Sequence, residues 1–359
     1  MRTIRRPAVA AALLALSAAA ACGSPPVADK TGDRTVVLTL GTIDVLDPNG
    51  QSPAATALVK TLSDLSGGRL KVRTTTEFES GQPNAESDLV KAIGLGKFDL
   101  GIPSARAFAA AGLPGLQALE APFVITSRAA ENAIATGPVG RDLLATLDSS
   151  DVAGLALAPG PLRRPFGKRP LLSPADWQGT TFRSFNSPAQ TQTITALGGR
   201  PVTASFDFAT LVAQGTLQGA EIDIAQYQRN HYGALLPAVT GNVVLWPKIT
   251  VLTINRATYE RLDPRQRSWL RQAADTAVQA TLDYAYDEAA PAAAMCAAGV
   301  RFYDAADADV AALHNAVRPV LDSLAADPVS AHLLAKIQQV VAEHPGVDLP
   351  DIPADCLTR

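Results

Sequence analysis

The sequence is poor in charged residues, which make up 18% of its 359 residues and leave a net charge of −3 at pH 7. Such a balance gives no electrostatic reason to expect a nucleic-acid partner. The length is sufficient for two domains, each with its own buried core. We therefore expect an ordinary globular protein, and we expect it to be a monomer.

Catalytic motifs are missing too: the chain has no Gly-x-Ser-x-Gly elbow, no His-Glu-x-x-His and no phosphate loop ending in Gly-Lys-Ser/Thr. Gly94 and Gly96 follow a predicted helix and lack a third glycine, so they do not form a dinucleotide fingerprint. The few histidines are too far apart in sequence for a local metal site: His231, His314, His332 and His344. We expect no enzyme, no cofactor and no metal, with an exported hydrolase or lyase kept as an alternative because catalytic groups can converge from distant positions.

Long apolar runs are absent after the N-terminus, so no later segment is a candidate membrane span. Residues 1–21 combine three arginines with a short alanine-rich run, which predicts a signal peptide. Cys22 follows small residues and resembles the lipidated cysteine of a bacterial lipoprotein signal; ordinary cleavage that leaves a free thiol is the alternative. Residues 22–33 then read as a polar tether. We expect a protein outside the cytoplasm, anchored by lipid to the outer face of the cell membrane.

Cysteine is also scarce, with three in the chain. If Cys22 carries lipid, Cys296 and Cys356 remain as an even pair in an oxidising compartment. We expect them to form a disulfide, although spacing alone leaves two buried free thiols possible.

What the sequence does contain is an alternation of strands and helices. β-Branched runs at 35–40 and 70–76 flank an apolar helical pattern at 52–65, and this order predicts a parallel α/β sheet. Further predicted elements are strands at 98–102, 152–157 and 243–254, a helix at 127–147, and a long helix from Asp263-Pro264 to about residue 290. Together they predict two α/β lobes, and ligands in such architectures bind in the crevice at the carboxyl ends of the strands.

Residues 160–206 hold the most distinctive charges. Arg163, Arg164, Lys168 and Arg169 form a cationic cluster, and Arg183 lies alone between apolar neighbours. A guanidinium binds a carboxylate through two parallel hydrogen bonds, so Arg163 and Arg183 are candidate anion contacts. For Arg163 the alternative is a surface residue in a solvated cationic loop, to which we assign Arg164, Lys168 and Arg169. For Arg183 the alternative is a structural ion pair.

Several segments, in their order and spacing, resemble the DctP-type solute-binding proteins of TRAP (tripartite ATP-independent periplasmic) transporters. The matching segments are 66–72 (SGGRLKV), 86–99 (ESDLVKAIGLGKFD), 121–123 (APF), 173–183 (SPADWQGTTFR), 196–206 (ALGGRPVTASF) and 211–221 (LVAQGTLQGAE). The resemblance covers nearly the whole mature chain.

The resemblance implies a periplasmic-binding-protein-like type II fold, with two α/β lobes around a ligand cleft and a long hinge-spanning helix. We expect lobe I at 34–160 plus 248–287 and lobe II at 161–247 plus 288–359. It also implies capture of a small organic anion and its delivery to TRAP transporter membrane subunits. A ligand-sensing adaptor without transport is the alternative.

The resemblance further implies site residues. Arg183 holds the ligand carboxylate, and Arg163 takes the place, twenty residues earlier, of a second arginine in sialic-acid-binding members. Asn186, Phe206 and Glu221 match other positions of the family pattern, while Trp246 is either an aromatic wall or a core residue. Gln218 and Ile222 depart from the pattern, and we expect a more apolar pocket wall near Ile222, which favours a smaller or more hydrophobic carboxylate over a polyhydroxylated one.

Overall fold

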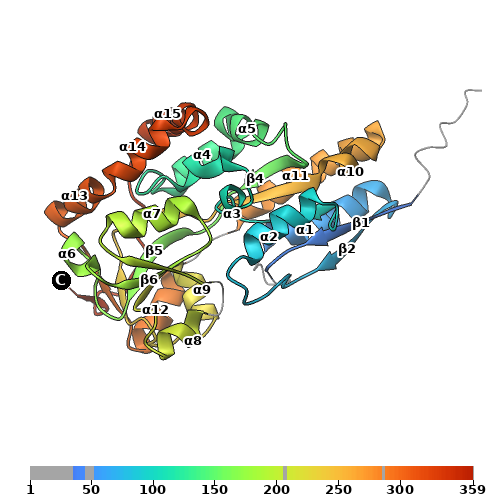
Figure 1. Ribbon diagram of the computed structural model, residues 1–359. Helices are drawn as coiled ribbons and strands as arrows, with labels where there is room; N and C mark the ends of the chain where they lie inside the picture. Colours follow the sequence, from blue (N-terminus) through green and yellow to red (C-terminus); the bar gives the residue numbers. More distant parts are fainter. Residues whose placement is uncertain (1–34, 45–51, 205–207, 285–287, 359) are drawn as a thin grey trace, which may run out of the picture.

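In the computed structural model, residues 35–44, 52–204, 208–284 and 288–358 are described. Two α/β lobes, each built around its own sheet, lie next to each other (Figure 1), as the predicted fold class requires. The predicted signal peptide, Cys22, the tether and Phe206 lie outside the described residues. Across the described ranges, no helix is both long and apolar enough to pass through a membrane.

The sheet of lobe I has the strand order β2-β1-β3-β11-β4. β1 is parallel to both its neighbours, whereas β11 runs antiparallel to β3 and β4. Four of its five strands coincide with predicted strands, at 35–40, 70–76, 98–102 and 152–157. The strands are β1 (Val36–Gly41), β2 (Leu70–Thr75), β3 (Leu100–Gly101), β4 (Val152–Ala158) and β11 (Thr250–Asn255).

Helices cover both faces of this sheet. α1 (Pro53–Ser66) and α11 (Pro264–Asp283) pack on one face through residues such as Leu58, Leu62 and Leu270. Gly67, with a φ of 58°, ends α1 in the left-handed conformation that glycine adopts most readily. The other elements of the lobe I layers are α2 (Ala85–Gly94), α3 (Ala107–Ala110), the 3-10 helix η2 (Pro114–Glu120), α4 (Arg128–Thr136), α5 (Pro138–Ala145) and α10 (Arg256–Arg261).

The predicted helix at 127–147 is two helices, because Gly137 and Pro138 interrupt it: α4 ends at Thr136 and Pro138 begins α5. Proline at the first helical position loses no hydrogen bond, whereas in a helix interior it would.

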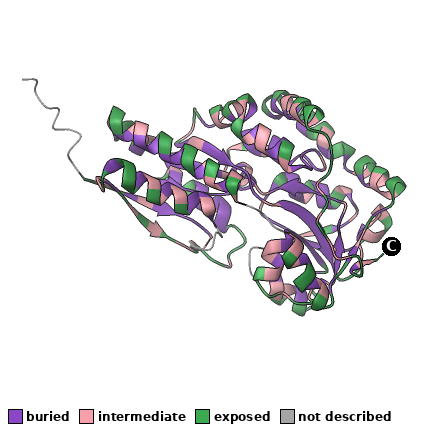
Figure 2. Ribbon diagram, turned by 180° about the vertical axis from the view of Figure 1, so that it is seen from behind, coloured by how far each residue is buried: buried purple, intermediate pink, exposed green. Residues whose placement is uncertain are grey.

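The sheet of lobe II has the order β13-β12-β9-β5-β8-β6-β7, with β10 paired to β5. Its strands are β5 (Leu162–Gly167), β6 (Thr181–Ser184), β7 (Arg200–Thr203), β8 (Gly219–Ile222), β9 (Ala238–Thr240), β10 (Trp246–Pro247), β12 (Arg301–Tyr303) and β13 (Leu357–Thr358). Its helices are α6 (Pro174–Trp177), α7 (Pro188–Ala196), α8 (Phe208–Ala213), α9 (Ile224–Arg229), α12 (Ala289–Ala297) and α13 (Asp307–Ala316). As Figure 2 shows, the central strands of both sheets are buried, whereas the edge strands β2 and β7 are partly exposed.

The chain passes between the lobes at several places. β4 leads into β5 through Pro159–Pro161, and β10 leads into β11 through 248–249. The single strand predicted at 243–254 is therefore two strands in different sheets, because Pro247 has no N–H to continue a ladder.

The predicted long helix from 264 to 290 is also shorter than expected. The Asp263 cap is confirmed, since its side chain accepts from the backbone N–H of Gln266 at 2.9 Å, but α11 ends at Asp283 and packs on lobe I alone. Pro291 lies in the first turn of a separate helix, α12, which packs on lobe II.

The last helices run in a row along the outside of both lobes (Figure 1). α14 (Arg318–Ala326) follows α13, and α15 (Pro328–Glu343) packs into the lobe I core with Leu334 and Ile337. The tail then returns to lobe II, where β13 pairs with β12. The lobe boundaries remain a prediction, and α15 lies on the lobe opposite to the one to which it was assigned.

Candidate functional site

The strand order of lobe II brings three of the predicted residues together. β8 lies between β5 and β6, so Glu221 on β8 is flanked by Arg163 on β5 and Arg183 on β6. Both arginines are almost fully buried, at 1% and 2% exposure, and Glu221 is at 0%. Burial alone would raise the pKa of Glu221, but the arginine charges around it hold that pKa below its ordinary value. Glu221 is therefore a buried, ionised carboxylate.

Arg163 has carboxylates on two sides. Its Nε donates to Oε2 of Glu221, and its Nη1 donates to Oδ2 of Asp223 at 2.6 Å and to Oε1 of Gln226 at 2.8 Å. Its Nη2 donates to the backbone oxygen of Glu221 at 3.1 Å. Each nitrogen of this guanidinium thus has a partner within lobe II, and its charge is compensated there.

Arg183 is held differently. Its guanidinium lies between two aromatic rings, with Cζ 4.6 Å from the ring centre of Phe185 and 4.4 Å from that of Phe208. Nη2 donates to the backbone oxygen of Glu221 and lies 3.4 Å from Oε1 of the same residue. Nε has no hydrogen-bond partner among the described residues. Burial lowers the pKa of Arg183 to about 10, so its charge is only partly compensated.

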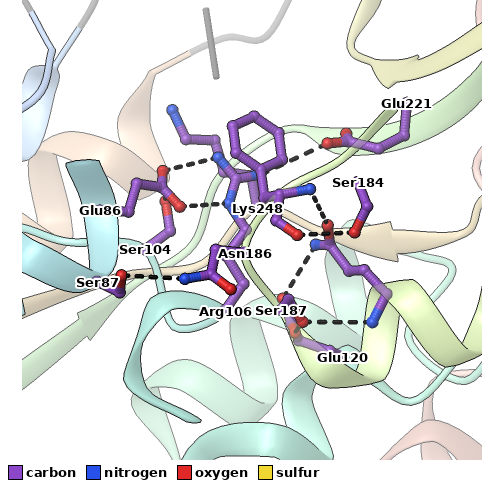
Figure 3. Close-up of polar contacts among 12 residues, drawn as sticks. Glu86, Ser87, Ser104, Arg106, Glu120, Ser184, Asn186, Ser187, Glu221 and Lys248 are labelled. Carbon is purple, nitrogen blue, oxygen red and sulfur yellow. Dashed lines mark hydrogen bonds and ion pairs between the residues drawn. The ribbon is translucent and has the colours of Figure 1, made fainter. Parts of the chain in front are cut away.

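Lobe I contributes a third arginine that sequence reasoning missed. Arg106, at the start of α3, forms a fork with Glu86 on α2: Nε to Oε2 at 2.7 Å and Nη2 to Oε1 at 2.8 Å (Figure 3). Ser104 also donates to Oε1 of Glu86, at 3.1 Å. The sequence held one usable signal, since Arg106 is the only charged residue between Asp99 and Glu120.

Arg106 faces the cluster of lobe II across the cleft. Its guanidinium carbon lies 3.3 Å from the ring centre of Phe185, and its Nη1 lies 3.6 Å from Oε1 of Glu221 (Figure 3). Burial would lower the pKa of Arg106, but Glu86 and the other carboxylates raise it above its ordinary value. This arginine is therefore a firmly charged group at the contact between the lobes.

Asn186, another predicted site residue, also joins the lobes. Its Nδ2 donates to Oδ1 of Asn84 at 3.0 Å and to Oγ of Ser87 at 3.2 Å, both near the start of α2. These bonds and the Arg106 contact show the cleft in a closed arrangement.

A buried carboxyl completes the closed contact. Glu120, at the end of η2, accepts from Oγ of Ser187 and from Nε2 of Gln190 at 3.1 Å, both at the beginning of α7. Burial raises the pKa of Glu120 to about 7, although its hydrogen bonds and the nearby charge of Arg106 act to lower it. The lobes therefore meet through a group that titrates near neutral pH.

A cavity of about 260 Å³ lies next to this cluster. Its lining includes Asp223 and Gln226, the partners of Arg163, together with Lys248 and Asp44, whose Nζ and Oδ2 are 3.6 Å apart. The cavity is bounded by both lobes and by the crossover at Pro159–Pro161. Among the described residues, no group of three or more histidine, cysteine, aspartate or glutamate side chains is arranged to hold a metal ion.

The remaining predicted residues lie elsewhere. Trp246 is 1% exposed and packs in a lobe II core cluster with Trp177 and Phe182, and it does not line the cavity. Ile222 packs in the opposite core of the sheet, because neighbouring residues of a strand point to opposite faces, so the expected apolar wall does not come from it. Cys296 and Cys356 are joined by a disulfide, with their Cα atoms 5.7 Å apart.

The assignment of Arg164 to a solvated loop was wrong. Arg164 lies on β5 at 1% exposure, and its guanidinium donates to the backbone oxygens of Gly241 at 3.1 Å and Asp348 at 2.7 Å. Lys168 and Arg169 follow the strand and are exposed.

Comparison with known proteins agrees with this architecture. A solute-binding protein of Roseobacter denitrificans (strain ATCC 33942 / OCh 114) is 27% identical over 77% of this chain and 87% of its own. A solute-binding protein of Verminephrobacter eiseniae (strain EF01-2) is 28% identical over 48% of this chain, and the match spans half of that protein's length.

Solved structures share the fold. A TRAP periplasmic solute-binding protein of Ralstonia eutropha H16 with bound (S)-2-acetolactate superimposes with a TM-score of 0.76 at 21% identity, over 86% of this chain and 99% of the other. A protein of the same description from Sulfitobacter sp. NAS-14.1, with bound β-D-galacturonate, gives 0.74 at 20% identity, over 85% and 100%. The family model DctP, bacterial extracellular solute-binding protein family 7, matches residues 47–327. The chain therefore belongs to the bacterial extracellular solute-binding proteins of family 7.

Proposed function

We propose that this protein captures an organic acid between its two lobes, outside the cytoplasm, and delivers it to a TRAP-type secondary transporter. Membership of family 7 supports this proposal, and so do the carboxylates held by the Ralstonia and Sulfitobacter proteins. Residues 1–21 and Cys22 fit export and lipid anchoring. If a Cys22→Ser variant still fractionated with membranes and still took up labelled fatty acid, Cys22 would not be the lipidated residue.

The observation that carries the proposal is the state of Arg183. It is buried at the contact between the lobes, its Nε has no partner among the described residues, and its pKa is lowered by burial. A carboxylate bound there supplies the missing compensation, and it does so in a site from which water is excluded, where charge pairs are strongest.

Closure follows from where the charged groups lie. Arg183 and Glu221 belong to lobe II, whereas Arg106 and Glu86 belong to lobe I. Only when the lobes approach does a ligand gain contacts from both sides, so binding shifts the protein towards the closed state. The lining of the cavity includes Asp223 and Lys248 but not Arg183, Arg106 or Glu221, so we expect the lobes to open before a ligand reaches Arg183.

The test is a thermal-shift screen followed by calorimetry. The screen uses short hydroxy, keto and amino acids and sugar acids, because a tight ligand raises the melting temperature by mass action. Arg183→Ala should then weaken binding of the best acid by about 2 to 5 kcal/mol, the cost of truncating one partner of a desolvated charge pair. Arg169→Ala, an exposed arginine on the same segment, is the matched control.

Arg183→Lys is a second variant that keeps the charge but loses the planar fork. Melting curves without ligand establish that each variant is folded. Undiminished affinity in a folded Arg183→Ala protein would remove Arg183 as the anchor, and failure of every acid to shift the melting temperature would overturn the proposed function.

A further inference from the structure

The carboxyl of Glu120 lies where the beginning of α7 meets lobe I. Oγ of Ser187 donates to Oε2 of Glu120 (Figure 3), and Nε2 of Gln190 donates to Oε1 at 3.1 Å. Oε1 of Gln190 accepts in turn from the backbone N–H of Phe185 at 3.3 Å, which orients this amide towards Glu120. Glu120 ends η2 in lobe I, whereas both of its donors belong to lobe II. These two bonds join the lobes, so they break when the lobes separate.

Glu120 differs from the other carboxylates of the lobe contact in how its charge is compensated. The guanidinium of Arg106 binds Glu86 through Nε and Nη2, at 2.7 Å and 2.8 Å, and its Nη1 lies 3.6 Å from Glu221. The donors to Glu120 are a neutral hydroxyl and a neutral amide, and among the described residues it forms no ion pair. At 4% exposure, an ionised Glu120 is a buried charge stabilised by neutral donors alone, which is costly.

The charged groups around Glu120 do not remove this cost. Arg106 and Glu86 face it from the start of α3 and from α2, with opposite charges. Lys248 lines the same small cavity as Glu120, and its Nζ lies 3.6 Å from Oδ2 of Asp44. Neither α7 nor β10 contains a charged residue. The charged and titratable residues of α5 and α15, which pack on η2 from lobe I, are exposed or half-buried: Arg141, Asp142, His332, Lys336 and Glu343.

The protonation state of Glu120 therefore depends on whether the lobes are closed. In the closed form, burial raises its pKa to about 7, although the bonds from Ser187 and Gln190 and the charge of Arg106 act to lower it. When the lobes separate, both donors leave with lobe II and water reaches the carboxyl, whose ordinary pKa is 4.5. A hydroxyl accepts as well as donates, so the contact with Ser187 also suits a protonated Glu120, and Gln190 still donates to Oε1.

From this geometry we propose that Glu120 takes up a proton when the lobes close, so that capture of the organic acid is coupled to proton binding. The inference rests on the proposed function and adds a proton to it: one acid anion and one proton enter the closed protein together. Glu120 acts through the lobe contact and does not need to touch the ligand, so it is a positioning residue for closure.

The sign of the pH dependence follows from proton binding. Because the pKa of Glu120 is raised in the closed form, its contribution to closure is fully present below 4.5 and is lost as pH rises through about 7. Acid affinity should therefore fall by about tenfold from pH 5.5 to 7 and level off near pH 8. The carboxyl groups of the acids have pKa values of about 4, so the ligands stay ionised over this range.

Calorimetry measures the proton directly. The probe is the acid that binds most tightly among L-lactate, pyruvate, D-erythronate and D-galacturonate, titrated into the purified protein at pH 6 in MES and in imidazole buffer, whose enthalpies of ionisation differ. The difference between the two binding enthalpies gives the number of protons taken up, and we expect about one per acid. Affinities at pH 5.5, 6, 7 and 8 then give the pH profile.

Glu120→Gln separates proton binding from a structural role. The amide has the shape and the hydrogen bonds of a protonated Glu120 but does not titrate. Proton uptake should fall close to zero, the pH profile should flatten, and at pH 8 the variant should bind the acid about tenfold more tightly than wild type. A merely structural role predicts the opposite, weaker binding at every pH. Glu260→Gln, at an exposed glutamate, should behave as wild type.

Glu131→Gln is a second control, because burial also raises the pKa of Glu131, at the crossover between the lobes. This variant should keep the proton uptake that accompanies acid binding. Uptake that is lost in Glu131→Gln would place the proton at the crossover and overturn the role of Glu120.

The outcomes separate this inference from the proposed function. If acids bind without proton uptake at pH 6, or with the same uptake in a folded Glu120→Gln protein as in wild type, the coupling is wrong and acid capture stands. If none of the four acids binds, and none in the wider screen, both fall. If Glu120→Gln does not fold, the uptake measured for wild type and Glu131→Gln still decides.

Discussion

On the two faces of strand β5, the charges of buried arginines are compensated in different ways. Arg163 and Arg164 are adjacent and equally buried, yet Arg163 points to the cleft and binds the carboxylates of Glu221 and Asp223. Arg164 points to the C-terminal tail, where it donates chiefly to backbone oxygens, and its one carboxylate contact, Glu288, is 3.3 Å away. Burial lowers the pKa of Arg164, against the raising effect of Glu288 and other acids.

The difference separates two uses of a buried charge. A ligand cannot replace a backbone oxygen, so the contacts on the tail face, the side of β5 on which Arg164 lies, fix the chain in place. Nη2 of Arg164 donates to the backbone oxygen of Asp348, and the backbone N–H of Arg128 donates to the carboxylate of Asp348. The tail beyond Asp348 pairs with the lobe II sheet. The cleft face pairs charge with charge, and such partners can be replaced by a ligand of the same sign. Arg183 lies on the cleft face but, like Arg164, has a lowered pKa. That combination of partial compensation and location at the lobe contact supports our proposal that Arg183 is the anchor.

The largest effect expected from this comparison comes from Arg163. Arg163→Ala leaves Glu221 and Asp223 buried without their main cation, and breaking a buried pair in this way costs about 3–5 kcal/mol of unfolding free energy. Urea unfolding without ligand measures the loss, and Arg169→Ala should stay within about 0.5 kcal/mol of wild type. A loss below about 1 kcal/mol would mean that the cleft carboxylates do not depend on Arg163.

The second effect is expected from loss of the Cys296–Cys356 disulfide, which holds the C-terminal tail. Replacing Cys296 and Cys356 together by alanine frees the tail from α12, and loss of such a bridge typically costs about 2–4 kcal/mol. Because neither residue is near Glu221, we expect acid affinity to change by less than about twofold, in contrast to the cleft variants. Calorimetry and urea unfolding on the same samples check both statements; Cys22→Ala is the matched control. A large loss of affinity would show that the tail controls closure.

The sequence predicted the elements of the fold better than the site. Strands 35–40 and 70–76 and the Asp263 cap were readable because β-branched runs and capping residues act locally. The helix predicted from 264 to 290 was wrong because α11 ends at Asp283, and Pro291 lies in the first turn of a separate helix, α12. The single strand predicted at 243–254 was wrong because β10 ends at Pro247 and β11 belongs to the other sheet. Arg164 was misplaced for a related reason, since no local pattern tells a strand with two arginines from a basic loop.

Arg183 and Glu221, which lie together in lobe II, could be named from the sequence because they belong to recognisable segments; their role in binding a ligand stays a prediction. Arg106 could not, since its partners lie on another helix and in the other lobe, and only the folded chain brings Glu86, Phe185 and Glu221 around it. Likewise, nothing local indicates that Arg163 is already compensated by Asp223.

A change of one pH unit has the smallest expected effect, and it arises on the tail face, at Glu131 of α4. This side chain is 0% exposed; Oε1 accepts from the backbone N–H of Gly160 at 2.7 Å, and Oε2 has no partner among the described residues. Burial raises the pKa of Glu131 to about 8, while the Gly160 bond and the Arg128 charge lower it and Asp348 raises it. The crossover between the lobes is thus held by a carboxyl that prefers its neutral form.

The sign of the effect follows from proton binding. Between the ordinary pKa of 4.5 and about 8, the folded protein keeps a proton on Glu131 that the unfolded chain releases, so the free energy of unfolding falls as pH rises through this window. For one proton the slope approaches about 1.4 kcal/mol per pH unit.

Urea unfolding at pH 5, 6, 7 and 8 should show a shallower slope for Glu131→Gln than for wild type, and the control Glu260→Gln should have the wild-type slope. Some dependence should remain in the variant, because Glu120 has a pKa raised to about 7 on the cleft face. If the free energy of unfolding changed with pH in the same way for wild type and Glu131→Gln, Glu131 would be ionised in the folded protein. The tail face would then compensate its charges as fully as the cleft does.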